Sequence, residues 1–462
     1  MKKAIIFSAI TACLIIIFFD PAVAGDLQGD TKGWKAGVAR VVITPEEPIW
    51  MAGYASRTKP SEGTLVDLWA KALAIEDAKG KKVLLITSDL LGFPRKMSDR
   101  IRNQIGAKFG LTRAQIILSS THTHSGPVLQ DALYDIYPLD AKQIEIIEKY
   151  SAKLEKQIVT LSGEAIRSMV PAQLYAQNGV TRFQVNRRNN PAATISTQWD
   201  LNGPNDYAVP VLKVMNEAGD IMAVAFGYAC HATTLDINLF SGDYPGYAQL
   251  ELEKMHPGIT AMFFQGAGAD QNPLPRRTIP LAQQYGRELA AAVERVLSEE
   301  MHRLEPSIST AYSEIRLPFA KPPTEEELVK FEKEARDYQK RWAANQLKMI
   351  RNGEPRMTSY PYPVQIWKLG DQPVMAMGGE VVVQYAIELK KLFGEGIFVM
   401  SYVNDDMNYI PSVTILNEGG YEGDTAHRVY GLPARWTPEI ESIILREFEK
   451  LAVKTGINKA IK

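Results

Sequence analysis

Six short apolar runs stand out along the 462-residue chain, separated by polar and turn-forming residues. A short continuous apolar run between turn signals is typical of a β-strand buried on both faces. The predicted strands are Lys82–Thr87, Gln115–Ser119, Ile221–Tyr228, Ile259–Phe264, Pro373–Met377 and Ile397–Tyr402.

Two stretches between these runs have the periodicity of helices. From Ile147 to Ala165, apolar residues recur at every third or fourth position, which places them on one face of a helix. Thr324 and Glu327 form a capping-box sequence, which predicts a helix that begins there and continues to about Arg351.

The last predicted helix has Thr437 as its N-cap and Pro438 in its first turn. Its expected buried face consists of Ile440, Ile443, Ile444, Phe448 and Leu451. Strands that alternate with helices predict an α/β fold. We expect a mixed, largely parallel sheet flanked by helices, with the active site at the carboxyl ends of the strands.

The N-terminus has the pattern of a targeting segment. Lys2 and Lys3 precede the apolar run Ala4–Phe19, and Ala22–Ala24 offers a cleavage site for a signal peptide. The run is shorter than the roughly 20 residues of a membrane span, which disfavours an uncleaved anchor. Lipidation at Cys13 is a further alternative, although the residues after it are strongly apolar. We therefore predict a signal peptide over residues 1–24 and an exported protein, periplasmic or extracellular.

No break in composition demands a second domain, so residues 25–462 are expected to form one domain. The charged helix at about 324–351 is expected to be a lid or an excursion from the main body.

The net charge is -1, whereas nucleic-acid-binding proteins usually carry a basic face, so no nucleic-acid partner is expected. After signal-peptide removal Cys230 is the one remaining cysteine, which predicts a mature chain without an internal disulfide.

Chemically informative residues follow the predicted strands. His122 and His124 come after the second strand, and His231 comes after the third. Glu380 comes after the fifth strand, where the chain enters a helical pattern. Active sites of α/β folds are built from polar groups at the carboxyl ends of strands, so these four residues are candidates for a common site.

Imidazole is the commonest zinc ligand, and a catalytic zinc takes three protein ligands and a water. In an extended His-x-His segment both rings point to the same side, so His122 and His124 can face one metal. His231 and Glu380 would complete that site. Two alternatives stay open, because His231 can be a hydrogen-bonded core residue and Glu380 can be a charge at a helix N-terminus. The remaining histidines, expected to be surface or structural residues, are His256, His302 and His427.

The candidates lie in an ordered series of motifs that resembles the neutral (non-lysosomal) ceramidases. The resemblance extends from about Val38 to Gly423, and its most specific motif is Thr121–Pro127. The other motifs are Val38–Pro45, Met51–Tyr54, Trp69–Leu73, Asn186-Arg187, His231, Ser241–Asp243, Gly379-Glu380, Tyr409 and Tyr421–Gly423.

The resemblance implies one Zn²⁺ per chain. The implied ligands are His122, His231, Glu380 and Tyr409. It further implies that His124 and Tyr421 line the site and hydrogen-bond the reacting carbonyl or its oxyanion. Arg187 would hold a polar group of the substrate or the loop that faces the zinc, and Asp243 would orient a ligand from behind. Without the resemblance, Tyr409 would be interpreted as a core residue.

The activity that the resemblance implies is zinc-dependent hydrolysis of the linear amide of an N-acyl lipid such as ceramide, to a fatty acid and a sphingoid base. A lipid substrate also implies contact with a membrane surface. Two alternatives are a zinc hydrolase acting on another amide, ester or lactone, for example one derived from a sugar, and a non-catalytic binding protein on the same scaffold. A long apolar groove would favour the lipid, and a small polar cavity would favour a soluble substrate.

The chain departs from the family pattern in two places. Gln271 stands where the family has a serine, which bears on the contact to the substrate's polar group. The family usually carries a C-terminal immunoglobulin-like domain, whereas this chain stops at Lys462 after one predicted helix. Both departures weaken the prediction of ceramide as the substrate more than they weaken the prediction of zinc-dependent hydrolysis.

Overall fold

The structure is a computed structural model that describes Met1 and residues 33–460. The predicted signal peptide over residues 1–24 and the alternative lipidation at Cys13 lie outside the described residues and stay predictions. Gly33–Lys462 forms one compact unit, within which the described residues build the elements below.

The largest element of this unit is a nine-stranded sheet with the order β11-β9-β8-β6-β1-β3-β4-β5, in which β13 also pairs with β6. Its strands are β1 (Trp34–Val42), β3 (Trp69–Glu76), β4 (Lys82–Ser88), β5 (Ile116–Ser120), β6 (Val170–Val180), β8 (Ala208–Asn216), β9 (Ile221–Tyr228), β11 (Thr260–Gln265) and β13 (His302–Arg303). Each of the four predicted strands in this part of the chain corresponds to an observed one, with ends that differ by at most one residue.

The predicted mixed α/β fold is confirmed, but the balance within the sheet differs from the expectation of a largely parallel one. Only the pairs β4–β5 and β9–β11, near the two ends of the order, are parallel, and the central pairs are antiparallel. Tight turns account for two of the antiparallel pairs: Asp77–Lys81 joins β3 to β4, and Glu217–Asp220 joins β8 to β9. Such short turns reverse the chain, whereas a parallel pair needs a long crossover connection.

A second sheet has the order β14-β15-β16-β18 and packs against the large sheet. Its strands are β14 (Ile308–Pro318), β15 (Ser359–Leu369), β16 (Gln372–Met377) and β18 (Phe398–Met400). Side chains of β3 alternate between the two faces of the large sheet. Leu73 belongs to the core between the sheets, together with Trp367 and Phe398, while its neighbours Ala72 and Ala74 belong to the core on the other face.

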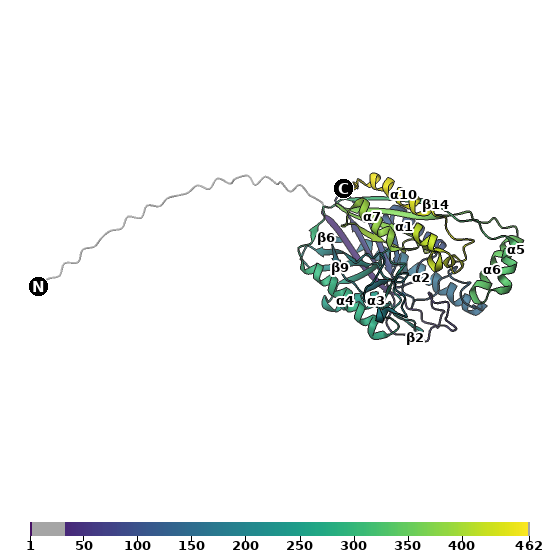
Figure 1. The fold of residues 1–462 in the computed structure, drawn as a ribbon. Coiled ribbons are helices and arrows are strands. Elements are labelled where there is room, and N and C mark those ends of the chain that lie inside the picture. The colour runs from purple at the N-terminus through teal and green to yellow at the C-terminus, as the bar shows by residue number, and fades with distance from the viewer. Residues whose placement is uncertain (2–32, 461–462) are drawn as a thin grey trace. The chain divides into compact units, whose positions relative to one another are not determined.

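Helices cover the outer face of each sheet (Figure 1). The large sheet is covered by α1 (Arg95–Phe109), α2 (Ala141–Arg167), α3 (Asp243–Met255) and α4 (Ile279–Ser298). The second sheet is covered by α7 (Val383–Phe393) and α10 (Glu439–Thr455). The result is four layers, in the order helices, large sheet, second sheet and helices. No helix in the described part of the chain is both long and apolar enough to cross a bilayer.

Two helix predictions need correction. The helix expected from Thr324 to Arg351 is two helices, α5 (Glu325–Glu334) and α6 (Asp337–Arg351), because Arg336 is extended and Asp337 has a φ of 49°. The capping box itself is confirmed, since the Thr324 amide donates to the Glu327 carboxylate and the Glu327 amide donates to the Thr324 hydroxyl. In the last helix the N-cap is Pro438, one residue after the expected Thr437. Of its predicted buried face, Ile443 is only half-buried, and the other four residues are buried.

The two ends of the large sheet meet, and this brings distant loops together. β11 and β5, the first and last strands of the order, contact each other. The segment after β18 joins them, since the Ser401 amide donates to the Gln265 carbonyl of β11 and the Asn404 amide donates to the Leu118 carbonyl of β5. The loops that follow β5, β9 and β11 therefore converge with those of the second sheet.

Short paired strands and helices fix these loops. The strand pairs are β2 (Gly63–Thr64) with β10 (Leu239–Phe240), β7 (Gln184–Asn186) with β12 (Gln271–Pro273), and β17 (Glu380–Val381) with β19 (Tyr409–Ile410). Two short helices, α8 (Val413–Glu418) and α9 (Gly420–Gly423), follow β19.

Candidate active site

Three histidines meet where the sheet ends converge. His122 and His231 follow β5 and β9 within three residues, and both are completely buried. One ring nitrogen from each of His122, His124 and His231 lies within 4.8 Å of the others. The Nε2 atoms of His122 and His124 are 3.2 Å apart.

The sequence predicted this meeting from an incorrect local geometry. The segment after β5 is not extended, because His122 has a φ of 57° in the left-handed region. The two rings are therefore not on one face of a strand, and they lie edge to face, at 82° to each other. A left-handed conformation is uncommon for a residue other than glycine, and here it turns the His122 ring towards His231.

Backbone carbonyls fix the orientation of two of the rings. The Leu91 carbonyl lies 2.8 Å from Nδ1 of His122, and the Gly268 carbonyl lies 3.0 Å from Nδ1 of His231. A carbonyl only accepts, so each Nδ1 carries the proton and each Nε2 presents a lone pair to the centre. This arrangement is typical of histidines that bind a metal, because the outer hydrogen bond selects the tautomer.

Glu380 closes the cluster from the second sheet. Its Oε2 lies 3.0 Å from Nε2 of His231 and 3.3 Å from Nε2 of His122. Gly379 precedes it with a φ of 72°, and an added Cβ there would lie 2.7 Å from the Asn408 carbonyl, so this tight approach requires glycine. The other oxygen, Oε1, accepts a hydrogen bond from the hydroxyl of Tyr430.

The spacing of these atoms fits a tetrahedral zinc ion. Ligand atoms about 2.0–2.1 Å from zinc are about 3.3 Å from one another in a tetrahedron. The observed distances are 3.0–3.3 Å between Glu380 and the two imidazoles, and 3.3 Å between the Tyr409 hydroxyl and Nε2 of His231. Two lone pairs and a carboxylate that face each other repel, unless a cation lies between them. The donor chemistry and the spacing therefore fit a metal.

The pKa shifts favour the deprotonated forms of His124, His231 and Glu380. Burial, followed by the charge of Arg187, lowers the pKa of His231 to about 4. Burial also lowers the pKa of His124 well below its usual value, and the neighbouring imidazoles lower it further. Burial opposes ionisation of Glu380, but the neighbouring His122 and His231 outweigh burial and hold its pKa well below the usual range. At neutral pH the buried imidazoles of His124 and His231 are thus uncharged beside the Glu380 carboxylate.

Tyr409 is buried and is held by Arg187. The Nη2 of Arg187 donates to the Tyr409 hydroxyl at 3.1 Å, and its Nε donates to Glu422 at 2.8 Å. Burial raises the pKa of Tyr409, and the Arg187 charge opposes that rise. Arg187 therefore joins Tyr409 to the loop around Glu422.

His124 and Tyr421 lie beside the cluster, His124 next to His122 and Tyr421 next to Tyr409. Nδ1 of His124 is buried without a hydrogen-bond partner among the described residues, so its tautomer is not fixed as those of the other two are. Its ring packs against Gly53, where an added Cβ would lie 2.4 Å from Nδ1. Tyr421 is 41% exposed and lies edge to face with Tyr409, at 5.2 Å.

Asp243 and Gln271 have positions that sequence alone could not give. Asp243 accepts from the amides of Leu235 and Tyr244, so it holds the loop after His231 and does not contact the imidazole itself. The backbone of Gln271 pairs with Asn186, and its carbonyl accepts from the His231 amide, while its side-chain amide donates to Pro204.

The remaining histidines lie outside the cluster. His256 pairs with Glu294, and His302 pairs with Asp371, both at least partly exposed. His427 is buried against Trp342 of α6, with ring centroids 5.6 Å apart.

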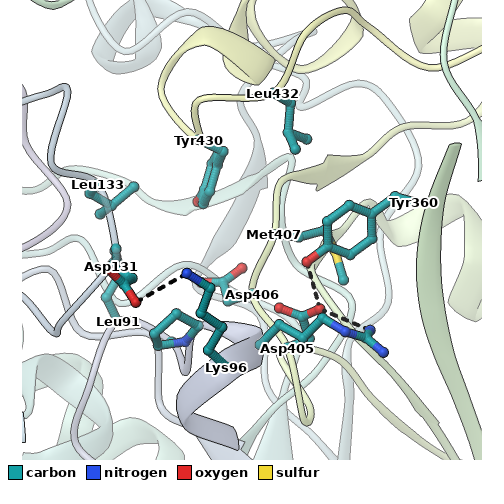
Figure 2. A pocket seen from close by; sticks show the side chains of 14 residues that line it. Leu91, Lys96, Asp131, Leu133, Tyr360, Asp405, Asp406, Met407, Tyr430 and Leu432 are labelled. Atoms are coloured by element: carbon teal, nitrogen blue, oxygen red, sulfur yellow. Dashed lines mark hydrogen bonds and ion pairs between the residues drawn. The ribbon is translucent and has the colours of Figure 1, made fainter. Parts of the chain in front are cut away.

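A cavity of about 220 Å³ is lined by Tyr430 and Asp406, among other residues (Figure 2). These two residues connect it to the cluster, because Tyr430 donates to Glu380 and Asp406 lies 3.8 Å from Nδ1 of His122. Its lining combines apolar side chains with charged groups: Leu91, Pro94, Leu133, Met407 and Leu432 alongside Arg95, Lys96, Asp131, Asp405 and Asp406. Tyr430 separates this cavity from Glu380. The residue carries no motif, and only its hydrogen bond in the folded chain reveals it.

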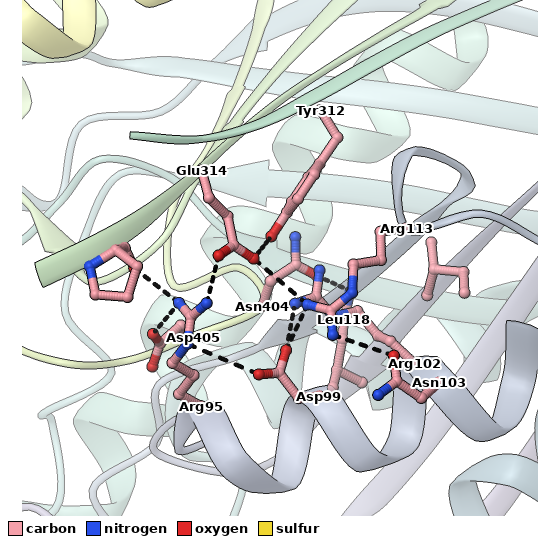
Figure 3. A network of polar contacts seen from close by, with 12 residues as sticks. Arg95, Asp99, Arg102, Asn103, Arg113, Leu118, Tyr312, Glu314, Asn404 and Asp405 are labelled. Carbon is pink, nitrogen blue, oxygen red and sulfur yellow. Dashed lines mark hydrogen bonds and ion pairs between the residues drawn. The ribbon is translucent and has the colours of Figure 1, made fainter. Parts of the chain in front are cut away.

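The cavity wall is held by a polar network and by α6. Asp405 accepts from the Tyr360 hydroxyl at 2.9 Å, and burial raises its pKa to about 7. Arg95 reaches both Asp405 and Glu314 of β14 (Figure 3). From α6, Trp342 donates to the Leu432 carbonyl, so the excursion predicted at 324–351 fastens a loop that lines the cavity.

Comparison with known proteins gives the family. A family model described as neutral/alkaline non-lysosomal ceramidase, N-terminal, matches residues 34–270. That range is just over half of the chain and includes His122, His124 and His231. Glu380 and Tyr409 lie beyond it.

Curated relatives are more distant and longer. The neutral ceramidase of Pseudomonas aeruginosa is 24% identical over 287 residues, which are 59% of this chain and 41% of the relative. Neutral ceramidase A of Dictyostelium discoideum is 26% identical over 282 residues, 57% of this chain and 38% of the relative. The matches thus span less than half the length of these relatives.

The fold is shared over most of the chain. The crystal structure of neutral ceramidase from Pseudomonas aeruginosa superposes with a TM-score of 0.71 at 18% identity, covering 93% of this chain and 76% of that one. The mixed sheets and their helices are therefore those of that fold. On the match to the family model, the chain belongs to the neutral/alkaline non-lysosomal ceramidase family.

Proposed function

We propose that this protein is a zinc-dependent amidohydrolase that cleaves the linear amide of an N-acyl lipid such as ceramide. The observation that carries the proposal is the convergence of His122, His231 and Glu380 with lone pairs inward and spacings suited to zinc. The family supplies the substrate class. In the net reaction water adds across the C–N bond, giving a carboxylate and an amine.

Zinc held there would supply Lewis acidity, which makes water nucleophilic at neutral pH and polarises the amide carbonyl. His122, His231, Glu380 and Tyr409 would hold the ion as its protein ligands. His124 and Tyr421 donate hydrogen bonds to the oxyanion that develops as the carbonyl becomes tetrahedral. Arg187 keeps the Tyr409 hydroxyl in place, so its part in the reaction is to position that group.

The cavity beside Tyr430 favours a second candidate, hydrolysis of a smaller amide, ester or lactone. Its volume of about 220 Å³ is below the range typical of pockets for drug-sized ligands, and charged side chains stand among its apolar ones. A short or polar substrate fits such a space better than a long acyl chain does.

The first test compares N-acyl-sphingosines of long and short acyl chain, assayed with the protein as purified, after chelation and after zinc is restored. We expect hydrolysis that chelation abolishes and zinc recovers. A clear preference for the long chain supports the lipid substrate, and a preference for the short chain favours the second candidate. Hydrolysis that persists without metal would refute zinc dependence.

We further propose that the protein is exported by a signal peptide over residues 1–24, and that residues 25–462 act as one catalytic domain. The sequence pattern Lys2, Lys3 and Ala4–Phe19 supports export. If the substrate is a lipid, the protein must also contact a membrane surface at least transiently. The N-terminal residue of the mature protein, read from periplasmic or culture fractions, tests cleavage after Ala24.

A further inference from the structure

Three arginines gather around Tyr54, on the His124 side of the site. The Nη1 of Arg277 donates to the Tyr54 hydroxyl at 2.7 Å, and the Arg277 guanidinium lies 4.8 Å from the centre of the Tyr54 ring. The guanidinium of Arg57 lies 5.4 Å from the same ring. The Tyr54 ring is itself 4.8 Å from that of His124. Arg276, the third arginine, is the chain neighbour of Arg277.

Arg276 connects this group to the loop that carries His231. Its Nη1 donates to the Thr233 hydroxyl at 3.2 Å, and the Thr233 amide donates to the His231 carbonyl at 2.9 Å. The arginine pair lies between β12 and α4, a few residues after Gln271, the position at which this chain departs from the family pattern. The group therefore borders the site at His124 and at the loop after His231.

Positive charge in this group exceeds the negative charge around it. The Arg277 Nε lies 3.5 Å from Asp236, a carboxylate that is 48% exposed in its side chain. The hydrogen bonds that the structure gives to Arg57 and Arg276 all go to neutral acceptors. The buried Asp243 is already bound by backbone amides.

The positive charges of these arginines also repel one another. Burial lowers the pKa of Arg276, and the charges of Arg277 and Arg187 lower it further. Arg276 and Arg277 are nevertheless only half-buried, so a ligand can reach them. A group of like charges attracts a ligand of the opposite sign, and a guanidinium binds a carboxylate through paired hydrogen bonds.

We propose that Arg276 and Arg277, backed by Arg57, form a subsite for a carboxylate that the substrate carries on the amine side of its scissile amide. The inference rests on the proposed amide hydrolysis and narrows its substrate class to acidic amides, of which N-acyl amino acids are the simplest. Hydrolysis of such a substrate takes up one water and releases a fatty acid and an amino acid.

Matched substrates test the subsite. N-dodecanoyl derivatives of glycine, γ-aminobutyrate and ε-aminohexanoate place the carboxylate at increasing distance from the amide. Each is compared with its neutral primary amide, and release of dodecanoate is measured. For at least one spacer we expect a KM about tenfold lower for the acid, as for a hydrogen bond between charged groups. The difference should shrink at high ionic strength. Equal KM values in every pair would overturn the proposal.

Variants assign the effect to the arginines. Arg276→Gln should raise the KM of the acid about tenfold, well beyond its effect on the paired amide, and Arg276→Lys should restore part of the preference. Arg295→Gln is the matched control, because Arg295 lies on α4 with a 75% exposed side chain and pairs with Glu299. An acid-to-amide KM ratio in Arg276→Gln that equals that of the wild type would contradict the subsite.

Binding separates this inference from the proposed function. If the wild type hydrolyses none of the amides, calorimetric titration with each pair still measures the preference for the carboxylate. Tighter binding of the acid that Arg276→Gln abolishes would keep the subsite while the proposed hydrolysis fails. Equal binding of acid and amide would overturn the subsite.

Discussion

The two halves of the candidate metal site are held in different ways. His122 and His231 follow strands of the large sheet, and backbone carbonyls of Leu91 and Gly268 fix their rings. Glu380 and Tyr409 come from a pair of two-residue strands, and side chains elsewhere in the chain fix them.

The difference predicts how each half tolerates substitution. A backbone carbonyl is present whatever the residue, so the histidine half depends on the local path of the chain. The carboxylate half depends on single side chains, chiefly Tyr430 and Arg187. Each single substitution there should therefore reduce zinc affinity in part.

Glu380→Gln should have the largest effect. The amide has the same shape but no charge, and it faces the lone pairs of His122 and His231. We expect zinc affinity to fall more than about a hundredfold, beyond the range typical of the loss of an outer-shell partner. Competition with a chelator of known affinity measures this loss. Affinity unchanged from the wild type would show that Glu380 is not a ligand.

Tyr430→Phe should have a smaller effect on the same half. Loss of the hydroxyl frees Oε1 of Glu380 and should weaken zinc binding about tenfold. The visible spectrum of the cobalt-substituted protein should shift as well, because the carboxylate can reorient. The control is Tyr360→Phe, which removes a hydroxyl from the same cavity that is bonded to Asp405 instead. Equal effects of the two variants would assign Tyr430 a purely structural role.

The smallest expected effect concerns stability away from the site. Burial is the main cause that lowers the pKa of His427 to about 4, whereas an unfolded histidine titrates near about 6.5. The unfolded state therefore binds more protons between these values, and the stability that neutral His427 contributes is lost as pH falls from about 6.5 to about 4. His427→Gln should reduce this loss by about 1–3 kcal/mol.

Urea unfolding of the wild type and His427→Gln at neutral and mildly acidic pH measures that difference. His302→Gln serves as the control, because His302 is exposed and its pair with Asp371 lies at the surface. The same loss of stability in the wild type and His427→Gln would contradict the assignment.

Sequence patterns predicted the parts of this structure that are local. Apolar runs located six strands, and the polar residues after them included His122, His231 and Glu380. Hydrophobic periodicity located α2 and the buried face of α10. Each of these features depends on a few consecutive residues, so a single chain segment contains the necessary information.

What sequence could not give depends on contacts between distant segments. The direction of strand pairing follows from turns and sheet order, and apolar runs carry neither. The left-handed turn at His122 replaced the extended geometry on which the prediction rested. Tyr430 stands fifty positions from Glu380 in an ordinary stretch, so its role emerges only when the chain is folded.

The central claim is tested most directly by the zinc content of the purified protein, measured together with hydrolysis of a fluorescent N-acyl-sphingosine, for wild type, His231→Ala and the control His256→Ala. We expect one equivalent of zinc and metal-dependent hydrolysis in the wild type and His256→Ala, and neither in folded His231→Ala. A wild type without bound metal, or a His231→Ala variant that keeps both metal and activity, would contradict it.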